Sequence, residues 1–157
     1  MEAERAKRWQ GNRPALAVQA WLRLARVFQR VEQASGEHLR RWGISTAQFD
    51  VLVHVGMCEG LTQQDLATAL LVTKGNICQL VDRIERDGLI RRVPSGRANR
   101  LYLTDAGRGL FHQAVPAQEA VLIRSFSRLD GDEQRHLLAL LRRLDQALSL
   151  VEVKEHT

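Results

Sequence analysis

The chain has 157 residues, of which 45% are hydrophobic and 26% charged, a balance typical of a soluble globular protein with one core. Lys and Arg number 23 against 18 Asp and Glu, so the formal net charge is +5, which suits a polyanion such as nucleic acid. No apolar run approaches the roughly 18 residues of a membrane span, and residues 1–8 alternate acids and bases instead of forming a signal peptide. We therefore expect a cytoplasmic protein with no membrane partner.

Apolar residues at helical spacing predict a long first helix over residues 14–34. Pro14 suits its first turn, where a missing N–H costs nothing. Gly36 is expected to interrupt this helix, and a short helical turn then follows over residues 37–42.

Helix starts are marked by capping residues along the middle of the chain. Ser45 and Gln48 have the spacing of a capping box and begin a second helix. Its expected buried stripe consists of Phe49, Leu52, Val53 and Gly56.

Two short helices follow in close succession. Thr62, with Asp65 three residues later, begins a helix that ends near Leu71, and Thr73 begins another that runs to Asp87. Gly88 is a natural C-terminal stop for the second of these helices.

After Gly88 the apolar period changes to that of strands. Residues 89–93 are expected to form one strand, Pro94, Ser95 and Gly96 to turn the chain, and residues 101–103 to form the returning strand. Thr104 then begins a helix to about residue 128, bent at Pro116. Residues 130 and 133 begin a final helix.

Two capped helices with a tight turn, followed by a hairpin, are typical of a winged helix-turn-helix. The expected fold class is mainly α with a small β-hairpin wing, and the helix from Thr73 would lie in the major groove, which is about 12 Å wide. Asn and Gln side chains can pair with adenine, and Lys or Arg with phosphate or guanine. The candidate DNA-binding residues on this helix are Thr73, Lys74, Gly75, Asn76, Gln79 and Arg83.

The hairpin tip, residues 94–100, carries Arg97 and Arg100. An arginine there can enter a narrow minor groove, where the potential is most negative. We favour this role for Arg97, while for Arg100 a salt bridge within the hairpin is an equal alternative. Arg91 and Arg92 could add phosphate contacts from the strand.

The motifs "STAQFDVLVHVG", "GLTQQDLATALLVTKGNICQLVDRIERDGLIRR" and "LYLTDAG" resemble the MarR family of bacterial regulators. The resemblance covers Ser45 to Leu110 and, more loosely, nearly the whole chain. It departs at the wing, where family members carry Asp-x-Arg and this chain has Ser95, Gly96 and Arg97.

The resemblance implies a homodimer that reads a palindromic double-stranded operator, most often as a repressor, with recognition helices about one helical turn apart. An apolar stripe in the last helix would pair with the second copy, although packing within one chain could also cover it; its residues are Leu137, Leu141, Leu144 and Leu148. The expected single domain, residues 1–157, comprises dimerisation helices over about 12–44 and 105–151 and a winged lobe over about 45–104.

Similar regulators bind a small aromatic or anionic effector between the dimerisation helices and the DNA-binding lobe. Candidates to line such a crevice are Trp21, Phe28, Trp42 and Phe111, although their spacing also suits plain core. A urate-responsive branch uses a tryptophan, an acid and an arginine; Trp9 or Trp21 and Asp50 match the first two. The arginine position holds Gln79 or Leu80, so urate is not assigned.

No cofactor or metal is expected. The two cysteines, Cys58 and Cys78, lack CxxC spacing, and both are expected to be packing residues, although Cys78 could be redox-sensitive on the recognition helix. No GxSxG, HExxH, Walker A or GxGxxG motif occurs, so an enzyme is not expected. The alternative function is a dimeric interaction bundle that retains the fold without binding DNA.

Overall fold

The computed structural model describes residues 15–155 of the chain. They form helices and one antiparallel pair of strands, as the sequence predicts. The chain divides into two compact units, the first ending at Gln118 and the second beginning at Glu119. Each unit is described by itself.

The first helix, α2 (Leu16–Leu39), is followed by a short 3-10 helix, η1 (Arg40–Trp42). The prediction that Gly36 interrupts the helix is wrong. A glycine within a helix costs about 1 kcal/mol, and the burial of Ser35 and Leu39 on either side of it favours continuation. The chain turns instead at Gly43, whose φ of 69° lies in the left-handed region that glycine tolerates.

Three capped helices follow: α3 (Thr46–Met57), α4 (Gln63–Ala69) and α5 (Lys74–Arg86). Both predicted capping boxes are present, one between Ser45 and Gln48 and one between Thr62 and Asp65. The predicted stripe of α3 is only partly right. Phe49, Val53 and Gly56 are half-buried, and the buried residues of α3 are Gln48, Val51, Leu52 and Val55.

The turn between α4 and α5 is closed by backbone hydrogen bonds. Val72 N–H donates to the Ala67 carbonyl at 3.0 Å, and Leu71 N–H donates to the Thr68 carbonyl at 3.2 Å. This is the Schellman pattern, which requires a left-handed residue, and Leu71 fills that position with a φ of 53°. The same pattern ends α5, where Gly88 takes the left-handed position.

The hairpin consists of β1 (Ile90–Ser95) and β2 (Ala98–Leu103). A turn is present, but its predicted position at Pro94, Ser95 and Gly96 is wrong. Pro94 pairs with Asn99 within the two strands, and the chain reverses at residues 96–97. A proline is tolerated there because an edge strand can leave one N–H unpaired. A further strand segment was not predicted: Gly60 N–H donates to the Leu101 carbonyl and Leu101 N–H to the Leu61 carbonyl.

Helix α6 (Asp105–Ser125) continues through Pro116, and α7 (Gly131–Glu155) follows. The predicted caps are present: the Thr104 hydroxyl accepts from Gly107 N–H at 3.0 Å, and Asp130 and Glu133 cap each other's backbone at 2.9 Å.

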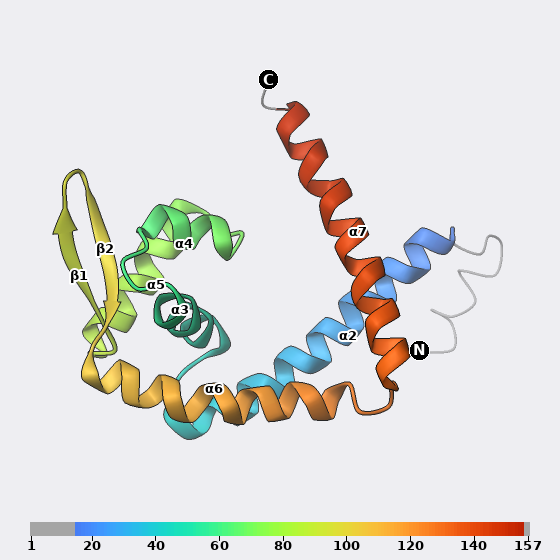
Figure 1. The fold of residues 1–157 in the computed structure, drawn as a ribbon, viewed down its shortest axis with the longest axis horizontal. Coiled ribbons are helices and arrows are strands. Elements are labelled where there is room, and N and C mark those ends of the chain that lie inside the picture. Colours follow the sequence, from blue (N-terminus) through green and yellow to red (C-terminus); the bar gives the residue numbers. More distant parts are fainter. Residues whose placement is uncertain (1–14, 156–157) are drawn as a thin grey trace, which may run out of the picture. The chain divides into compact units, whose positions relative to one another are not determined.

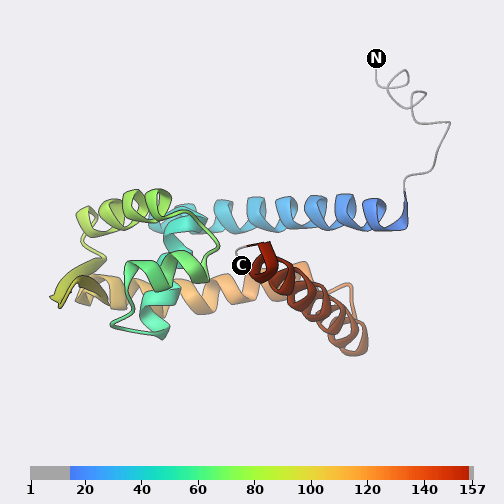
Figure 2. The same ribbon diagram turned by 90° about the horizontal axis from the view of Figure 1, so that it is seen from above.

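The core of the first unit lies among α3, α4, α5 and the hairpin (Figure 1). Viewed from above, these elements gather at the C-terminal end of α2 (Figure 2). The fully buried side chains of this core include Leu52, Val55, Leu66, Ile77, Val81, Ile84, Ile90 and Leu101. It holds α5 by one face and leaves the opposite face open.

Candidate nucleic-acid interface

Helix α5 has one buried and one exposed face. Ile77, Val81 and Ile84 are fully buried, and Leu80 packs half-buried against the same core. The predicted polar face is exposed, comprising Lys74, Gly75, Asn76, Gln79 and Arg83. The helix therefore presents amide and basic side chains on the side away from the core.

The N-terminal turn of α5 is open to solvent. The Thr73 hydroxyl accepts from the Asn76 N–H at 3.3 Å and fixes the start of the helix. A Cβ built on Gly75 would meet no atom within 4 Å, so packing does not require glycine here. An exposed helix N-terminus with free N–H groups is suited to a phosphate.

A shallow hollow lies along the exposed face of α5, lined by Asn76, Gln79, Leu80, Asp82, Arg83 and Arg86. Arg86 and Asp82 were not among the sequence candidates. The signal for both was present, because residues 79, 82, 83 and 86 share a helical face. The surface therefore contains a carboxylate as well as arginines.

Arg97 and Arg100 occupy different environments in the hairpin. Arg97 is exposed in the turn, next to Gly96 with its φ of 62°. The Arg100 guanidinium donates to the Gly60 carbonyl at 2.7 Å and to the Ser95 hydroxyl at 3.2 Å. Arg100 thus ties the wing to the turn between α3 and α4, through a carbonyl instead of the carboxylate that a salt bridge needs.

Arg92 lies between the hairpin and α5. Its guanidinium forms ion pairs with Asp82 and Glu85, and its backbone N–H donates to Glu85 Oε1 at 2.9 Å. Partial burial lowers the pKa of Arg92, but hydrogen bonds and charge from the two carboxylates outweigh it and raise that pKa above its ordinary value. Arg91, the next residue on the strand, lies with its guanidinium carbon 5.0 Å from the centroid of the Tyr102 ring.

The carboxylate of Asp65 is part of the cap of α4. It accepts from the Thr62 N–H at 2.9 Å and from the Thr62 hydroxyl at 2.7 Å. These hydrogen bonds, with a smaller contribution from the charge of Arg100, lower the pKa of Asp65 below its ordinary value.

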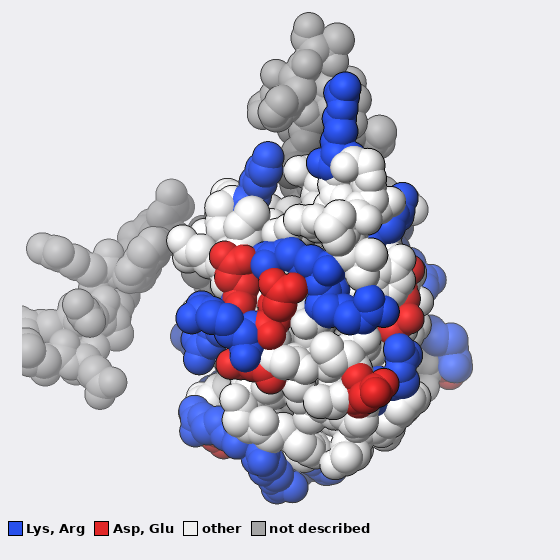
Figure 3. All heavy atoms as spheres, turned by 90° about the vertical axis from the view of Figure 1, so that its left-hand side faces the viewer, with Lys and Arg blue, Asp and Glu red and all other residues white. Residues whose placement is uncertain are grey.

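Basic and acidic side chains also lie next to each other on the hairpin side of the molecule (Figure 3).

The effector candidates lie in different surroundings. Phe111 packs against the core of the first unit, and the Trp42 ring meets that of His38 edge-on at 5.3 Å. Trp21 and Phe28 are 65% and 62% exposed on α2. Among the described residues of one chain, the four aromatic side chains therefore form no common pocket. Trp9 lies outside the described residues.

Asp50 and a nearby cavity are both close to the end of α2. Partial burial raises the pKa of Asp50, Glu32 adds to this, and His54 opposes it. Glu32 also lines a cavity that includes Arg40, Ser45, Thr46 and Arg83. The cavity combines two arginines with the N-terminal turn of α3.

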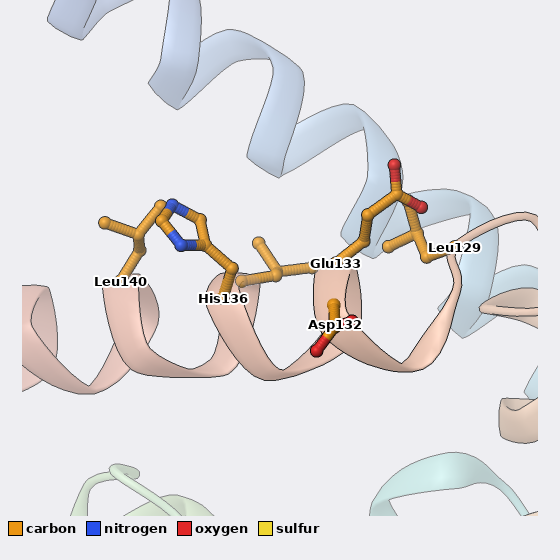
Figure 4. Close-up of a pocket in the computed structure, with 6 residues that line it drawn as sticks. Leu129, Asp132, Glu133, His136 and Leu140 are labelled. Atoms are coloured by element: carbon orange, nitrogen blue, oxygen red, sulfur yellow. The ribbon is translucent and has the colours of Figure 1, made fainter.

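The apolar stripe of α7 is largely uncovered. Leu137 is half-buried, while Leu141, Leu144 and Leu148 are 37%, 50% and 59% exposed. Near the start of the same helix, Leu129, Leu137 and Leu140 line a shallow apolar hollow. Glu133, His136 and Leu140 extend from one side of α7 (Figure 4).

The cysteines differ from the prediction at one position. Cys58 is exposed, so the prediction that it is a packing residue is wrong; it follows the last residue of α3, where the core face has ended. Cys78 is half-buried, and the Gln63 amide lies 3.6 Å from its sulfur. Among the side chains of residues 15–149, no three from His, Cys, Asp or Glu form a group that could hold a metal. No described helix combines the length and apolar character needed to cross a membrane.

The two capped helices, their tight turn and the paired strands define a winged helix-turn-helix protein. The model of the MarR family matches residues 42–101. An HTH-type transcriptional regulator of Bacillus cereus is 35% identical over 118 residues, covering 75% of this chain and 80% of that protein. The chain belongs to the MarR family of transcriptional regulators.

Solved structures share the fold. A mutant of MarR from E. coli, complexed with operator DNA, superposes with a TM-score of 0.77 at 24% identity, over 85% of this chain and 99% of that one. A MarR family protein of Mycobacterium tuberculosis, in complex with salicylic acid, gives a TM-score of 0.64 at 25% identity, over 86% and 98% of the two chains.

Proposed function

We propose that this regulator binds a palindromic double-stranded operator as a homodimer, represses transcription, and is released by a small aromatic or anionic effector. It works by binding, without catalysis and without a cofactor, on chromosomal DNA in the cytoplasm. The observation that carries the proposal is the exposed amide and basic face of α5, held against a core by its other face.

On DNA, α5 lies in the major groove and the wing reaches the adjacent minor groove. Asn76 and Gln79 read base edges, because their amides can pair with adenine N6 and N7. Thr73, Lys74 and Gly75 face a phosphate at the start of the helix, and Arg83 contacts phosphate or guanine. Arg97, exposed in the hairpin turn, enters the minor groove. Arg100 supports the wing through the Gly60 carbonyl and adds positive charge beside it.

The second copy covers the apolar faces of α2 and α7. Exposed large apolar residues on one protein mark an interaction surface, and Leu141, Leu144 and Leu148 repeat at helical spacing along α7. We assign residues 12–44 and 105–151 to dimerisation and residues 45–104 to the DNA-binding lobe. Two-fold symmetry then places the two α5 helices in successive major grooves.

The effector is a small molecule with an aromatic ring or an anionic group. The M. tuberculosis relative was solved with salicylic acid, which has both. Arg40 and Arg83 in the cavity beside α3 are suited to an anionic group. Of the aromatic candidates, Trp21 and Phe28 are exposed on α2 and could face an effector bound between two copies, whereas Phe111 packs against the core of the first unit. Trp42 and Asp50, near the end of α2, are the other proposed contacts.

The DNA contacts are tested by alanine variants in fluorescence-anisotropy titrations on a matched site and on a site with one changed base pair. Gln79→Ala should lose about 1–3 kcal/mol of discrimination at one base pair per half-site. Arg83→Ala should weaken binding to all duplexes. It should also reduce the slope of the logarithm of the binding constant against the logarithm of salt concentration by about 1, which corresponds to one phosphate contact. Arg128→Ala, which removes the same charge from an exposed position beyond α6, is the matched control. Wild-type behaviour of both α5 variants would refute the assigned face.

Dimerisation is tested by sedimentation velocity. Replacing Leu141 and Leu144 by glutamate places charges in the proposed interface and should yield monomers. The matched control places glutamate at the exposed Arg142 and Arg143, which lie between Leu141 and Leu144 in the sequence. A charged double variant that stays dimeric would remove α7 from the interface.

A further inference from the structure

Arg92 connects the wing to the recognition helix through three contacts. Its guanidinium pairs with Asp82 and Glu85 of α5, and its own N–H donates to Glu85 at 2.9 Å. The Arg92 side chain is only 19% exposed, while those of Asp82 and Glu85 are 55% and 36% exposed. The cation is thus covered between the two elements, and its carboxylate partners remain near the surface.

The two carboxylates oppose the proposed role of α5. Asp82 lines the same hollow as Gln79, Arg83 and Arg86, on the exposed face of α5 that is proposed to contact DNA. At physiological salt, charges interact over about 8 Å, so a carboxylate on a helix within the groove repels the phosphates. Without a counter-ion, Asp82 and Glu85 would cancel the favourable charge of Arg83 and Arg86.

We infer that Arg92 is a positioning residue for DNA binding, which neutralises Asp82 and Glu85 and fixes the wing against α5 instead of contacting phosphate itself. This inference rests on the proposed function. The sequence expectation of a phosphate contact from Arg92 gives way to a contact within the protein, because its guanidinium is turned toward α5.

The neighbouring residue Arg91 provides a matched control. Consecutive strand residues face opposite sides of a hairpin, and Arg91 is exposed over the Tyr102 ring, away from these carboxylates. Arg91→Met and Arg92→Met remove the same charge from adjacent positions. A difference between them therefore measures the pairing with α5 and not the net charge of the protein.

The test is a fluorescence-anisotropy titration of full-length variants on one duplex that the wild-type protein binds. Arg92→Met should weaken binding at least tenfold more than Arg91→Met. Adding Asp82→Asn and Glu85→Gln to Arg92→Met should restore affinity to within about threefold of wild type, because the repelling charges are then gone. Removing both partners of an ion pair also restores stability, so rescue of folding alone would not separate the two roles. A merely structural role for Arg92 would lower the urea midpoint of Arg92→Met and leave the affinity of the folded protein for DNA equal to that of Arg91→Met.

Two DNA-binding results would overturn the inference: equal losses for the two methionine variants, or a triple variant that stays as weak as Arg92→Met. Urea unfolding of the same variants, which needs no DNA, shows separately whether Arg92 and Glu85 are coupled in the folded protein; additive effects would also overturn it. A wild-type chain that binds no duplex refutes the proposed function, and that failure is visible before any variant is compared.

Discussion

Gln48 joins the start of α3 to the end of α5, and we predict that replacing it with alanine destabilises the protein strongly. Its side chain is only 3% exposed. Its Oε1 accepts from the Ser45 N–H at 3.0 Å, and its Nε2 donates to Asp87 Oδ2 at 2.9 Å. Ser45 and Asp87 are exposed, so water can solvate them in the variant, and alanine loses the net contribution of the two hydrogen bonds.

The magnitude follows from the kinds of hydrogen bond lost. A neutral hydrogen bond contributes about 0.5–1.5 kcal/mol and one to a charged group about 1.5–3 kcal/mol. Gln48→Ala should therefore lower the free energy of unfolding by about 2–4 kcal/mol. Urea denaturation followed by circular dichroism, at fixed protein concentration, measures this as a lower midpoint with an unchanged slope. Gln64→Ala, at an exposed position of α4, is the control and should change stability by less than about 0.5 kcal/mol.

Gln48→Glu provides a pH-dependent second test. It places a carboxylate against Asp87, and two like charges in contact raise the pKa of the pair in the folded state. A raised folded pKa contributes stability that is present at low pH and is lost as pH rises. The deficit relative to wild type should therefore be small near pH 4 and grow toward pH 7. An alanine variant as stable as wild type, or a glutamate variant with a pH-independent deficit, would refute the assigned contacts.

Three further predictions concern local contacts. Gly107→Ala should destabilise α6, because the new Cβ would lie 1.9 Å from a backbone carbonyl oxygen. Gly109→Ala meets no atom within 4 Å and should stabilise the same helix. Thermal unfolding of both variants tests this pair of predictions. Asp65→Asn should remove part of the acid sensitivity of the protein. The lowered pKa of the Asp65 carboxyl provides stability that wild type loses as pH falls below about 4. Urea midpoints of both proteins at several pH values measure this difference. Arg97→Ala should weaken DNA binding without changing the melting temperature, whereas Arg100→Ala should lower both, because only Arg100 is hydrogen-bonded within the protein; equal melting temperatures would contradict this.

Local signals in the sequence were sufficient for the helices that carry the site. Ser45 with Gln48 and Thr62 with Asp65 marked two helix starts, and Gly88 marked the end of α5. Each of these features depends on residues a few positions apart, so it is visible in the chain itself. The buried and exposed faces of α5 followed from the helical period for the same reason.

Contacts between distant segments could not be predicted in this way. The pairing of residues 60–62 with β2 involves only a short segment without an apolar alternation. The partners of Arg92 and Arg100 lie between 5 positions away, for Ser95, and 40 positions away, for Gly60. An arginine paired with carboxylates of its own chain and an arginine facing solvent have the same one-letter code, so only the structure separates Arg92 from Arg97.

Sequence-specific DNA binding by this MarR family member can be measured by a fluorescence-anisotropy titration. The duplexes come from the upstream region of its own gene, and the titration is run at several salt concentrations and with random competitor DNA. We expect tight, salt-dependent binding that survives the competitor. No binding at low salt, or binding abolished by the competitor for every upstream duplex, would contradict it and favour a dimeric bundle that interacts with other proteins.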